Sequence, residues 1–412
     1  MVPGPWFWNS SVTSFIIRRE LSPSVTSGWE GERRGVASQP TKVSFHSNKN
    51  RWITVLDMTE RFKIDGKVPI LKMGDYTLQL ELDDLGEECE RIAREELRET
   101  PEVVADALRK LKELIGDEKD LNVSLEDYFL IRYLRPCKFY PHSALERIKK
   151  FYKFRLKNPH LTDGLSPINE KKVFEQDLIT VLPKRTQNFH RIITIEIGIP
   201  LEVILSVVQS HQSLVKTDEP PLSSPNPTHP LEPRLFPVTE KWKLRACSLD
   251  DIFKASMIVL EGAVLEPRTQ ICGAEVIFDM EGLSMKQVMQ FSPSFAFNLV
   301  HFSQECMPLR LKHIHNVNQP YIFNLVFAIF KPFLSEKLRN RIHFHGSDWN
   351  SLHSYIDPEC LPTKYGGLMD IPENTGPKLH ELLCLFNEVY DGRYQWRHVD
   401  HCQGKPGLRR QR

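Results

Sequence analysis

Four histidines form two closely spaced pairs, His313 with His315 and His343 with His345. In a β-strand, residues i and i+2 share one face, so each pair could offer two ligands to a metal ion such as Zn²⁺. Neither pair has a flanking cysteine or carboxylate that would complete a ligand set. The alternative is that these histidines belong to polar networks at the ends of strands. We favour this alternative and expect no metal site.

Two carboxylates, Asp279 and Glu281, follow an apolar segment in the stretch FDMEG. At this spacing they could serve as a general acid and a general base. The alternative is structural, because acidic residues after a strand often cap the next helix and stabilise the turn, here at Gly282. The sequence contains no GxGxxG, GxxxxGK[ST], GxSxG or HExxH motif, which are common patterns of phosphate binding and catalysis. We therefore expect no enzyme activity, no catalytic residue and no cofactor.

Basic residues are concentrated between Met307 and His345, where six lysines and arginines accompany one acid. Six minus one leaves an excess of +5 in a chain whose formal net charge is +1. Within this stretch, Ile322 to Phe330 are apolar except for Asn324. Contiguous apolar and basic residues are typical of elements that bind reversibly to an anionic membrane surface. A solvated basic helix face is the alternative.

The apolar run from Ile322 to Phe330 is too short to cross a bilayer, because a spanning helix takes about 20 apolar residues. Its apolar side chains cover nearly the whole circumference of a helix, whereas a helix on a protein surface leaves one side polar. The run therefore needs apolar cover on two sides. Either it is a fully buried core helix, or a bound lipid supplies the second cover.

Length and composition limit the class of protein. A chain of 412 residues with 41% hydrophobic residues is long enough for two to three domains with their own cores. The net charge of +1 gives no reason to expect a nucleic-acid partner. Eight cysteines lie far apart without a CxxC pair, as in reduced cytosolic proteins. The first residues lack the features of a signal peptide, so we expect a cytoplasmic protein.

Three segments are expected to lie outside the folded domains or to interrupt them. Residues 1–57 are rich in Ser, Gly, Pro and Arg without periodicity, which predicts disorder or an extension outside the native coding sequence. Residues 199–240 hold eight prolines and are expected to be a disordered insertion or an artefact of the transcript. Residues 373–412 are expected to form a C-terminal helix followed by a basic tail.

Residues 76–165 are expected to form a helical N-terminal domain. Thr100 has the position of an N-cap, with Pro101 as the first helical residue. Ser124 and Asp127 resemble a capping box at the start of a second helix. A further helix is expected at 142–157, because Pro159 follows it.

Residues 166–372 are expected to form an α/β domain, because short β-branched segments alternate with helical ones. Such alternation predicts a mainly parallel sheet flanked by helices. The expected strands lie within 190–197, 270–279, 309–317 and 341–346, and the expected helices within 249–265, 284–304 and 320–340.

Five stretches together resemble the CRAL-TRIO (Sec14-like) family of lipid-binding proteins, and in particular its group of alpha-tocopherol transfer proteins and cellular retinaldehyde-binding proteins. The resemblance covers about 80–390 apart from 199–240. It implies a helical domain on an α/β domain that encloses one apolar ligand, closed by a mobile gate helix that matches 320–333. The stretches are LEDYFLIRYLRPCKF, VIFDMEG, FSPSFAFNLVHFSQECMPLRLKHIHNVNQP, FKPFLSEKLRNRIHFHG and SLHSYIDPECLPTKYGG.

The resemblance also implies which residues line the ligand pocket. Most of them are apolar, and Ser256 could form a hydrogen bond with a ligand hydroxyl group. The tocopherol carriers have a second serine on that helix, at the position of Leu260 here. The implied pocket residues are Phe253, Ser256, Leu260, Phe278, Phe291, Leu299, Phe302, Leu309, Phe323, Val326 and Phe327.

The resemblance further implies a site for phosphoinositide headgroups beside the gate. Arg310, Lys312, Lys337 and Arg341 match the basic positions of the tocopherol carriers. A further basic position of the family is Cys137 here, with Lys138 next to it.

The implied function is that of a monomeric carrier that binds a tocopherol-like or retinoid-like isoprenoid, or a phospholipid, and transfers it between membranes. Phosphoinositide-containing endosomal or plasma membranes would be its transient partners. The alternative is a lipid-regulated adaptor or chaperone without transfer activity.

Overall fold

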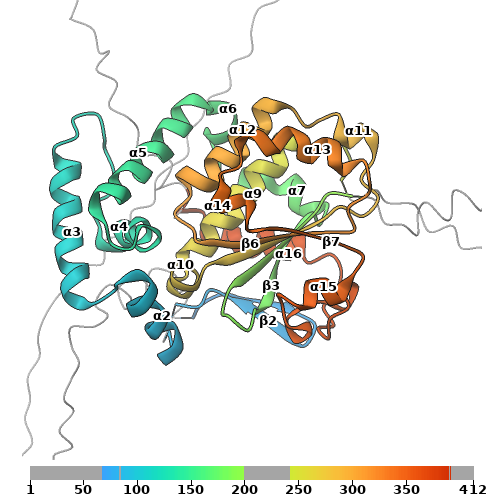
Figure 1. The fold of residues 1–412 in the computed structure, drawn as a ribbon, viewed down its shortest axis with the longest axis horizontal. Helices are drawn as coiled ribbons and strands as arrows, with labels where there is room; N and C mark the ends of the chain where they lie inside the picture. The colour runs from blue at the N-terminus through green and yellow to red at the C-terminus, as the bar shows by residue number, and fades with distance from the viewer. Residues whose placement is uncertain (1–66, 83–84, 199–241, 389, 391–412) are drawn as a thin grey trace, which may run out of the picture. The chain divides into compact units, whose positions relative to one another are not determined.

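The computed structural model describes residues 67–82, 85–198, 242–388 and 390 (Figure 1). The predictions for 1–57 and 199–240, and for the tail beyond residue 390, lie outside the described residues. The strands are β1 (Ile70–Met73), β2 (Tyr76–Gln79), β3 (Ile179–Arg185), β4 (Arg191–Glu196), β5 (Ala274–Asp279), β6 (Leu311–Val317) and β7 (Ile342–Gly346). The α-helices are α2 (Glu87–Leu97), α3 (Pro101–Gly116), α4 (Asp127–Leu134), α5 (Pro141–Lys157), α6 (Pro159–Thr162), α7 (Lys171–Glu175), α9 (Leu249–Leu265), α10 (Pro267–Cys272), α11 (Met285–Val288), α12 (Pro293–His301), α13 (Phe323–Phe330), α14 (Glu336–Arg339), α15 (Trp349–His353) and α16 (Gly376–Cys384). A π-helical turn, η3 (Phe302–Cys306), and the 3₁₀ segments η1 (Arg135–Cys137), η2 (Pro167–Glu170), η4 (Lys331–Phe333), η5 (Pro358–Cys360) and η6 (Thr363–Tyr365) complete the set.

Helices α2 to α5 form the N-terminal helical part, and their starts test the capping predictions. The Thr100 cap is confirmed, because its side chain accepts a hydrogen bond from the backbone N–H of Val103. The capping box at Ser124 is wrong. Helix α4 begins at Asp127 after Glu126, and the Ser124 hydroxyl accepts only from the Glu126 N–H. The spacing was right for a box, but the helix starts two residues too late to use it.

A β-hairpin occupies the start of the segment predicted to be helical. Strands β1 and β2 pair antiparallel around Gly74, whose φ of +63° favours glycine. Strand β2 lies against β3 of the main sheet. The expected helical domain beginning at residue 76 is therefore corrected: its first helix is α2, which begins at Glu87.

The main sheet has the order β3-β4-β5-β6-β7. Strand β3 is antiparallel to β4, and the three remaining pairs are parallel. The four predicted strands are confirmed as β4 to β7, and the predicted α/β class with a mainly parallel sheet is confirmed. The edge strand β3 was not predicted as a separate strand.

The sheet is covered on both faces. Helices α9, α12 and α13 lie over one face, and α15 with the following loops lies on the other, where Ile277 and Leu352 belong to a second apolar core (Figure 1). Helix α9 matches its predicted range of 249–265. The predicted helices 284–304 and 320–340 are each broken near a proline, Pro293 and Pro332, because proline has no N–H to continue a helical ladder. Among the described helices, none is long and apolar enough to span a membrane.

Candidate functional site

An apolar cavity of about 190 Å³ lies between the sheet and helices α9, α12 and α13. A dry cavity of about 150 Å³ can hold a molecule of benzene, so a whole lipid needs more room than the cavity has with α13 in this position. Ten of the eleven pocket residues expected from the sequence line it. They are Phe253, Ser256, Leu260, Phe278, Phe291, Leu299, Leu309, Phe323, Val326 and Phe327.

Phe302 is the expected pocket residue that does not line the cavity. It is fully buried, but its ring packs against Phe151 and Phe154 of α5, with centroids 6.4 and 5.2 Å away. The physical reason is local: α12 passes into the π-helical turn at Phe302, which changes the direction of the side chains that follow. Phe302 therefore supports the cavity wall through its contact with Phe253, 5.8 Å between centroids.

Sequence reasoning missed the floor of the cavity. Ile193, Ile195 and Ile197 line it from β4 and the residue after this strand, as does Asn316 from β6. The signal was present for the isoleucines, because their period of two places them on one face of a strand. Asn316 could not be found in this way, since nothing local marks an asparagine that faces an apolar cavity.

The two serine hydroxyl groups in the cavity each donate a hydrogen bond to a backbone carbonyl group. Ser256, 9% exposed, donates to the carbonyl of Ile252 at 2.8 Å, and Ser303 donates to Leu299 at 2.8 Å. Each hydroxyl keeps acceptor capacity. A polar group on a ligand in this cavity would therefore have to be a hydrogen-bond donor to pair with either serine.

Helix α13 closes one side of the cavity and exposes its other side. Phe323 and Val326 are buried against the cavity, whereas Leu325 is exposed on the outer face. Two further exposed apolar residues are Met289, directly after α11, and Phe297 on α12. Both helices contact α13. The apolar run thus has apolar cover on the cavity side, whereas its outer side is exposed and lacks the second cover that the sequence indicated.

The four basic residues expected beside the gate lie near one another. Burial and the charges of Arg341, Arg147, Lys138 and Arg310 hold the pKa of Lys337 below its ordinary value. Burial and the charge of Arg310 likewise lower the pKa of Lys312 and Arg341. We call the six residues Lys138, Arg147, Arg310, Lys312, Lys337 and Arg341 the basic cluster.

Two members of the basic cluster come from the helical part and were not predicted from the sequence as site residues. Arg147 on α5 donates to the carbonyls of Gln304 and Met307. Lys138 follows the expected position Cys137, and its charge acts on Lys337. The departure at Cys137 therefore leaves a cation in the same region.

The histidines lie on the face of the sheet opposite the cavity. Burial opposes ionisation of Glu275, but the hydrogen bonds from His190 and His315 hold its pKa at about 2. His315 Nε2–H therefore donates to Glu275 at 3.0 Å, and its Nδ1 accepts from His345 Nε2–H at 3.0 Å. His313 and His343 form a second pair at 3.0 Å. The histidines thus form hydrogen-bonded polar networks, which was the alternative to a metal site. Among the described residues, no group of three or more His, Cys, Asp or Glu side chains could hold a metal ion.

The two carboxylates of the FDMEG stretch do not face the cavity. Asp279 accepts from the backbone N–H of Glu281 at 3.0 Å and from the side chain of Asn318 at 3.1 Å. Gly282 follows with a φ of +68°. Asp279 thus stabilises the turn after β5, which is the structural alternative considered from the sequence.

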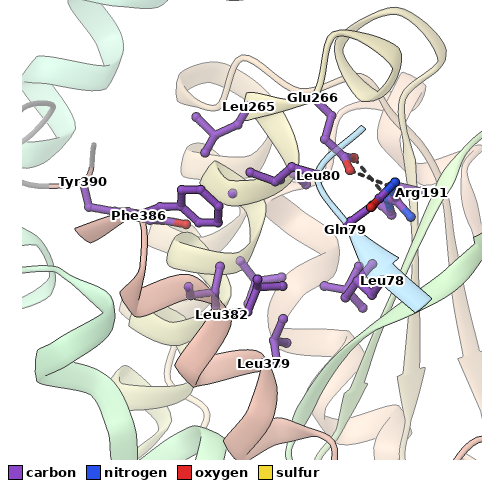
Figure 2. Close-up of a pocket in the computed structure, with 15 residues that line it drawn as sticks. Leu78, Gln79, Leu80, Arg191, Leu265, Glu266, Leu379, Leu382, Phe386 and Tyr390 are labelled. Atoms are coloured by element: carbon purple, nitrogen blue, oxygen red, sulfur yellow. Dashed lines mark hydrogen bonds and ion pairs between the residues drawn. The ribbon is translucent and has the colours of Figure 1, made fainter. Parts of the chain in front are cut away.

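A second, smaller cavity of about 40 Å³ lies between β2, α9 and α16 (Figure 2). Leu78, Leu382 and Phe386 contribute apolar side chains, and a buried ion pair between Glu266 and Arg191 closes one end (Figure 2). This volume has room for one to a few water molecules and is much smaller than the cavity under α13. The larger cavity is therefore the candidate ligand site.

Comparisons with known proteins found matches to one family and two kinds of relatives. The family model described as the CRAL/TRIO domain matches residues 229–367. Alpha-tocopherol transfer protein-like of Homo sapiens is 31% identical over 276 residues, which cover 67% of this chain and 68% of that protein. Clavesin-1 of Mus musculus is 27% identical over 332 residues, 77% of this chain and 82% of that protein. The solved structure titled "Crystal structure of Sfh5" aligns with 75% of this chain and 99% of that one, at 11% identity and a TM-score of 0.33, too low to compare the folds.

The chain therefore belongs to the CRAL/TRIO family. Proteins of this family bind hydrophobic lipids, and the predicted family is confirmed.

Proposed function

We propose that this protein binds one hydrophobic lipid in the cavity under α13 and transfers it between membranes. The observation that carries the proposal is the position of α13, which has the cavity on one side, an exposed apolar surface on the other and the basic cluster nearby. The name of the relative alpha-tocopherol transfer protein-like is consistent with transfer. The proposed ligand is a tocopherol-like or retinoid-like isoprenoid, or a phospholipid.

A carrier is needed because lipids leave membranes slowly. Each methylene group moved into water costs about 0.8 kcal/mol, so a tail of about 15 carbons costs on the order of 12 kcal/mol. A closed apolar cavity offsets most of that cost. Opening α13 at a membrane would let the lipid pass without meeting water. Tight binding then requires a trigger that favours the open state at the membrane.

The basic cluster is the proposed trigger. Each lysine or arginine close to an anionic leaflet contributes about 1 kcal/mol of attraction, and phosphoinositide headgroups concentrate that negative charge. Endosomal and plasma membranes carry such lipids, so we propose transient attachment there of a monomeric protein that otherwise resides in the cytoplasm. The exposed apolar side chains of α13 and its neighbours would enter the headgroup region once the cluster has bound.

The first experiment is solvent extraction and mass spectrometry of the purified full chain, which should find one lipid per protein. The second measures transfer of a fluorescent tocopherol analogue to phosphatidylcholine vesicles with and without phosphatidylinositol 4,5-bisphosphate. The double variant Lys337→Glu with Arg341→Glu should lose about 2 kcal/mol of membrane attraction or more, about 30-fold in binding. Its affinity for the tocopherol analogue should not change.

The matched control is Lys72→Glu with Lys378→Glu, which changes the net charge equally on β1 and α16. This control should transfer lipid at the wild-type rate. Equal transfer by wild type and by the Lys337 and Arg341 double variant would refute the trigger. Bound lipid without any transfer would instead favour a lipid-regulated adaptor.

A further inference from the structure

One acidic side chain is paired with the basic cluster. Glu96, near the end of α2, forms an ion pair with Arg310, and Lys312 Nζ lies 3.5 Å from the same carboxylate oxygen. The Glu96 side chain is 47% exposed, whereas Arg310 and Lys312 are 15% and 21% exposed. Arg310 also donates to the carbonyl of Ile271. The two cations are therefore held in the protein, while the carboxylate is the partner that can turn toward solvent.

Glu96 is ionised at neutral pH. Partial burial opposes ionisation, but the hydrogen bond from Arg310 and the charge of Lys312 hold the pKa of this carboxyl below its ordinary value. Within the described chain, no other carboxylate forms an ion pair with a member of the basic cluster. The charge of Glu305 reaches Arg147, but the ion pair of Glu305 is with Lys150, at 2.6 Å.

The simplest alternative is that Glu96 only attaches α2 to the rest of the protein. The packing of α2 argues against this. Cys89, Ala93 and Leu97 on the inner face of α2 are at most 3% exposed, and α2 contacts α10. Burial of apolar surface at about 25 cal/mol per Å² stabilises such docking much more than a half-exposed ion pair does. The position of α2 therefore does not require the Glu96 pair.

We propose that Glu96 is a built-in competitor of the basic cluster: it occupies Arg310 and Lys312 until a phosphate group displaces it. The inference rests on the proposed function, because it concerns the same anion site. It adds a residue that sets the affinity of the site. A phosphate that reaches Arg310 and Lys312 must break both Glu96 contacts, whereas an anion bound only at Lys337 and Arg341 need not.

This competition has a consequence for membrane selection. A weakly charged membrane surface attracts Arg310 and Lys312 too little to offset the loss of their contacts with Glu96. Glu96 would then stay paired with these two cations. A headgroup with several phosphates gains enough from the two fixed cations to displace the carboxylate, since charge-assisted hydrogen bonds to phosphate are strong. Glu96 would thus favour multiply phosphorylated headgroups over singly charged lipids.

The test measures binding of inositol 1,4,5-trisphosphate to the full chain by isothermal titration calorimetry, at about 0.1 M salt, where exposed charges still interact over about 10 Å. Glu96→Gln should bind about 3- to 10-fold more tightly than wild type, because two partly exposed ion pairs no longer compete. Glu96→Ala should give the same gain, which would exclude an effect of the amide. Thermal unfolding of each variant checks that the fold is retained.

The matched control is Glu95→Gln, which removes the same charge one residue away from a side chain that pairs with Arg91. Its affinity should equal that of wild type. Unchanged or weaker binding by both Glu96 variants, with wild-type binding that depends on Lys337 and Arg341, would overturn this inference alone. No binding by wild type or any variant would overturn the proposed anion site and this inference together.

Discussion

Acid should destabilise this protein through the histidines behind the sheet, and His345 allows the size of the effect to be worked out. This side chain is 6% exposed. Burial, with the charges of His315 and His343, lowers its pKa from 6.5 to about 4, against a smaller opposing effect of Asp348. The gap between these values corresponds to about 3 kcal/mol between the folded and unfolded states.

The sign follows from which state binds the proton more tightly. With a folded pKa of about 4 and an unfolded pKa of 6.5, the unfolded chain takes up the proton first as the pH falls. The contribution to stability is therefore complete above pH 6.5 and is lost as the pH falls toward 4. At about pH 5 the protein should have lost about 2 kcal/mol through His345 alone.

The assay is urea unfolding at pH 7 and pH 5 of the wild type and His345→Gln. The glutamine amide can still donate a hydrogen bond to His315 but does not titrate. The difference in unfolding free energy between the two pH values should be about 2 kcal/mol smaller in the variant. His142→Gln, at an exposed position on α5, is the control and should behave like wild type. The same pH dependence in His345→Gln and wild type would refute the reasoning.

Two further predictions concern a ligand contact and a buried ion pair. Ser256→Ala should weaken binding of a tocopherol analogue with a free hydroxyl about 3- to 10-fold, because one hydrogen bond is lost, and should leave its methyl ether unaffected; equal loss for both ligands would contradict the contact. Glu266→Ala should lower the unfolding free energy by about 3 kcal/mol in urea unfolding, because buried Arg185 and Arg191 lose their buried partner and keep the more exposed Glu81. Glu88→Ala, which breaks an exposed pair, should cost at most about 1 kcal/mol, and a similar loss in the two variants would contradict the argument.

Local sequence signals found four strands of the main sheet but not its edge strand β3. Strands β4 to β7 were predicted because β-branched residues alternate with helical segments. The hairpin at Tyr76 and the edge strand β3 were missed, since the conformation of such strands depends on the strand beside them as well as on their own residues. Helix α9 was predicted to the residue, because it is a long apolar segment between expected strands.

The residues predicted to line the cavity came from a family resemblance, not from local sequence signals. All eleven expected residues came from the resemblance to a family rather than from periodicity, and ten of them line the cavity. Phe302 failed because a π-helical turn shifts the side chains after α12, and no property of the residue itself indicates such a turn. Asn316 was missed because its role depends on which face of β6 the helices cover.

The sequence by itself determined the alternation of strands and helices, the basic excess around the apolar run and the membership in a lipid-binding family. These follow from local propensity, from charge and from motifs that are continuous along the chain. Tertiary structure alone decided that Lys138 and Arg147 join Lys337, and that Glu96 pairs with Arg310. These residues are far apart in the sequence, and only the packing of the helical part against the sheet domain brings their charges within interaction distance.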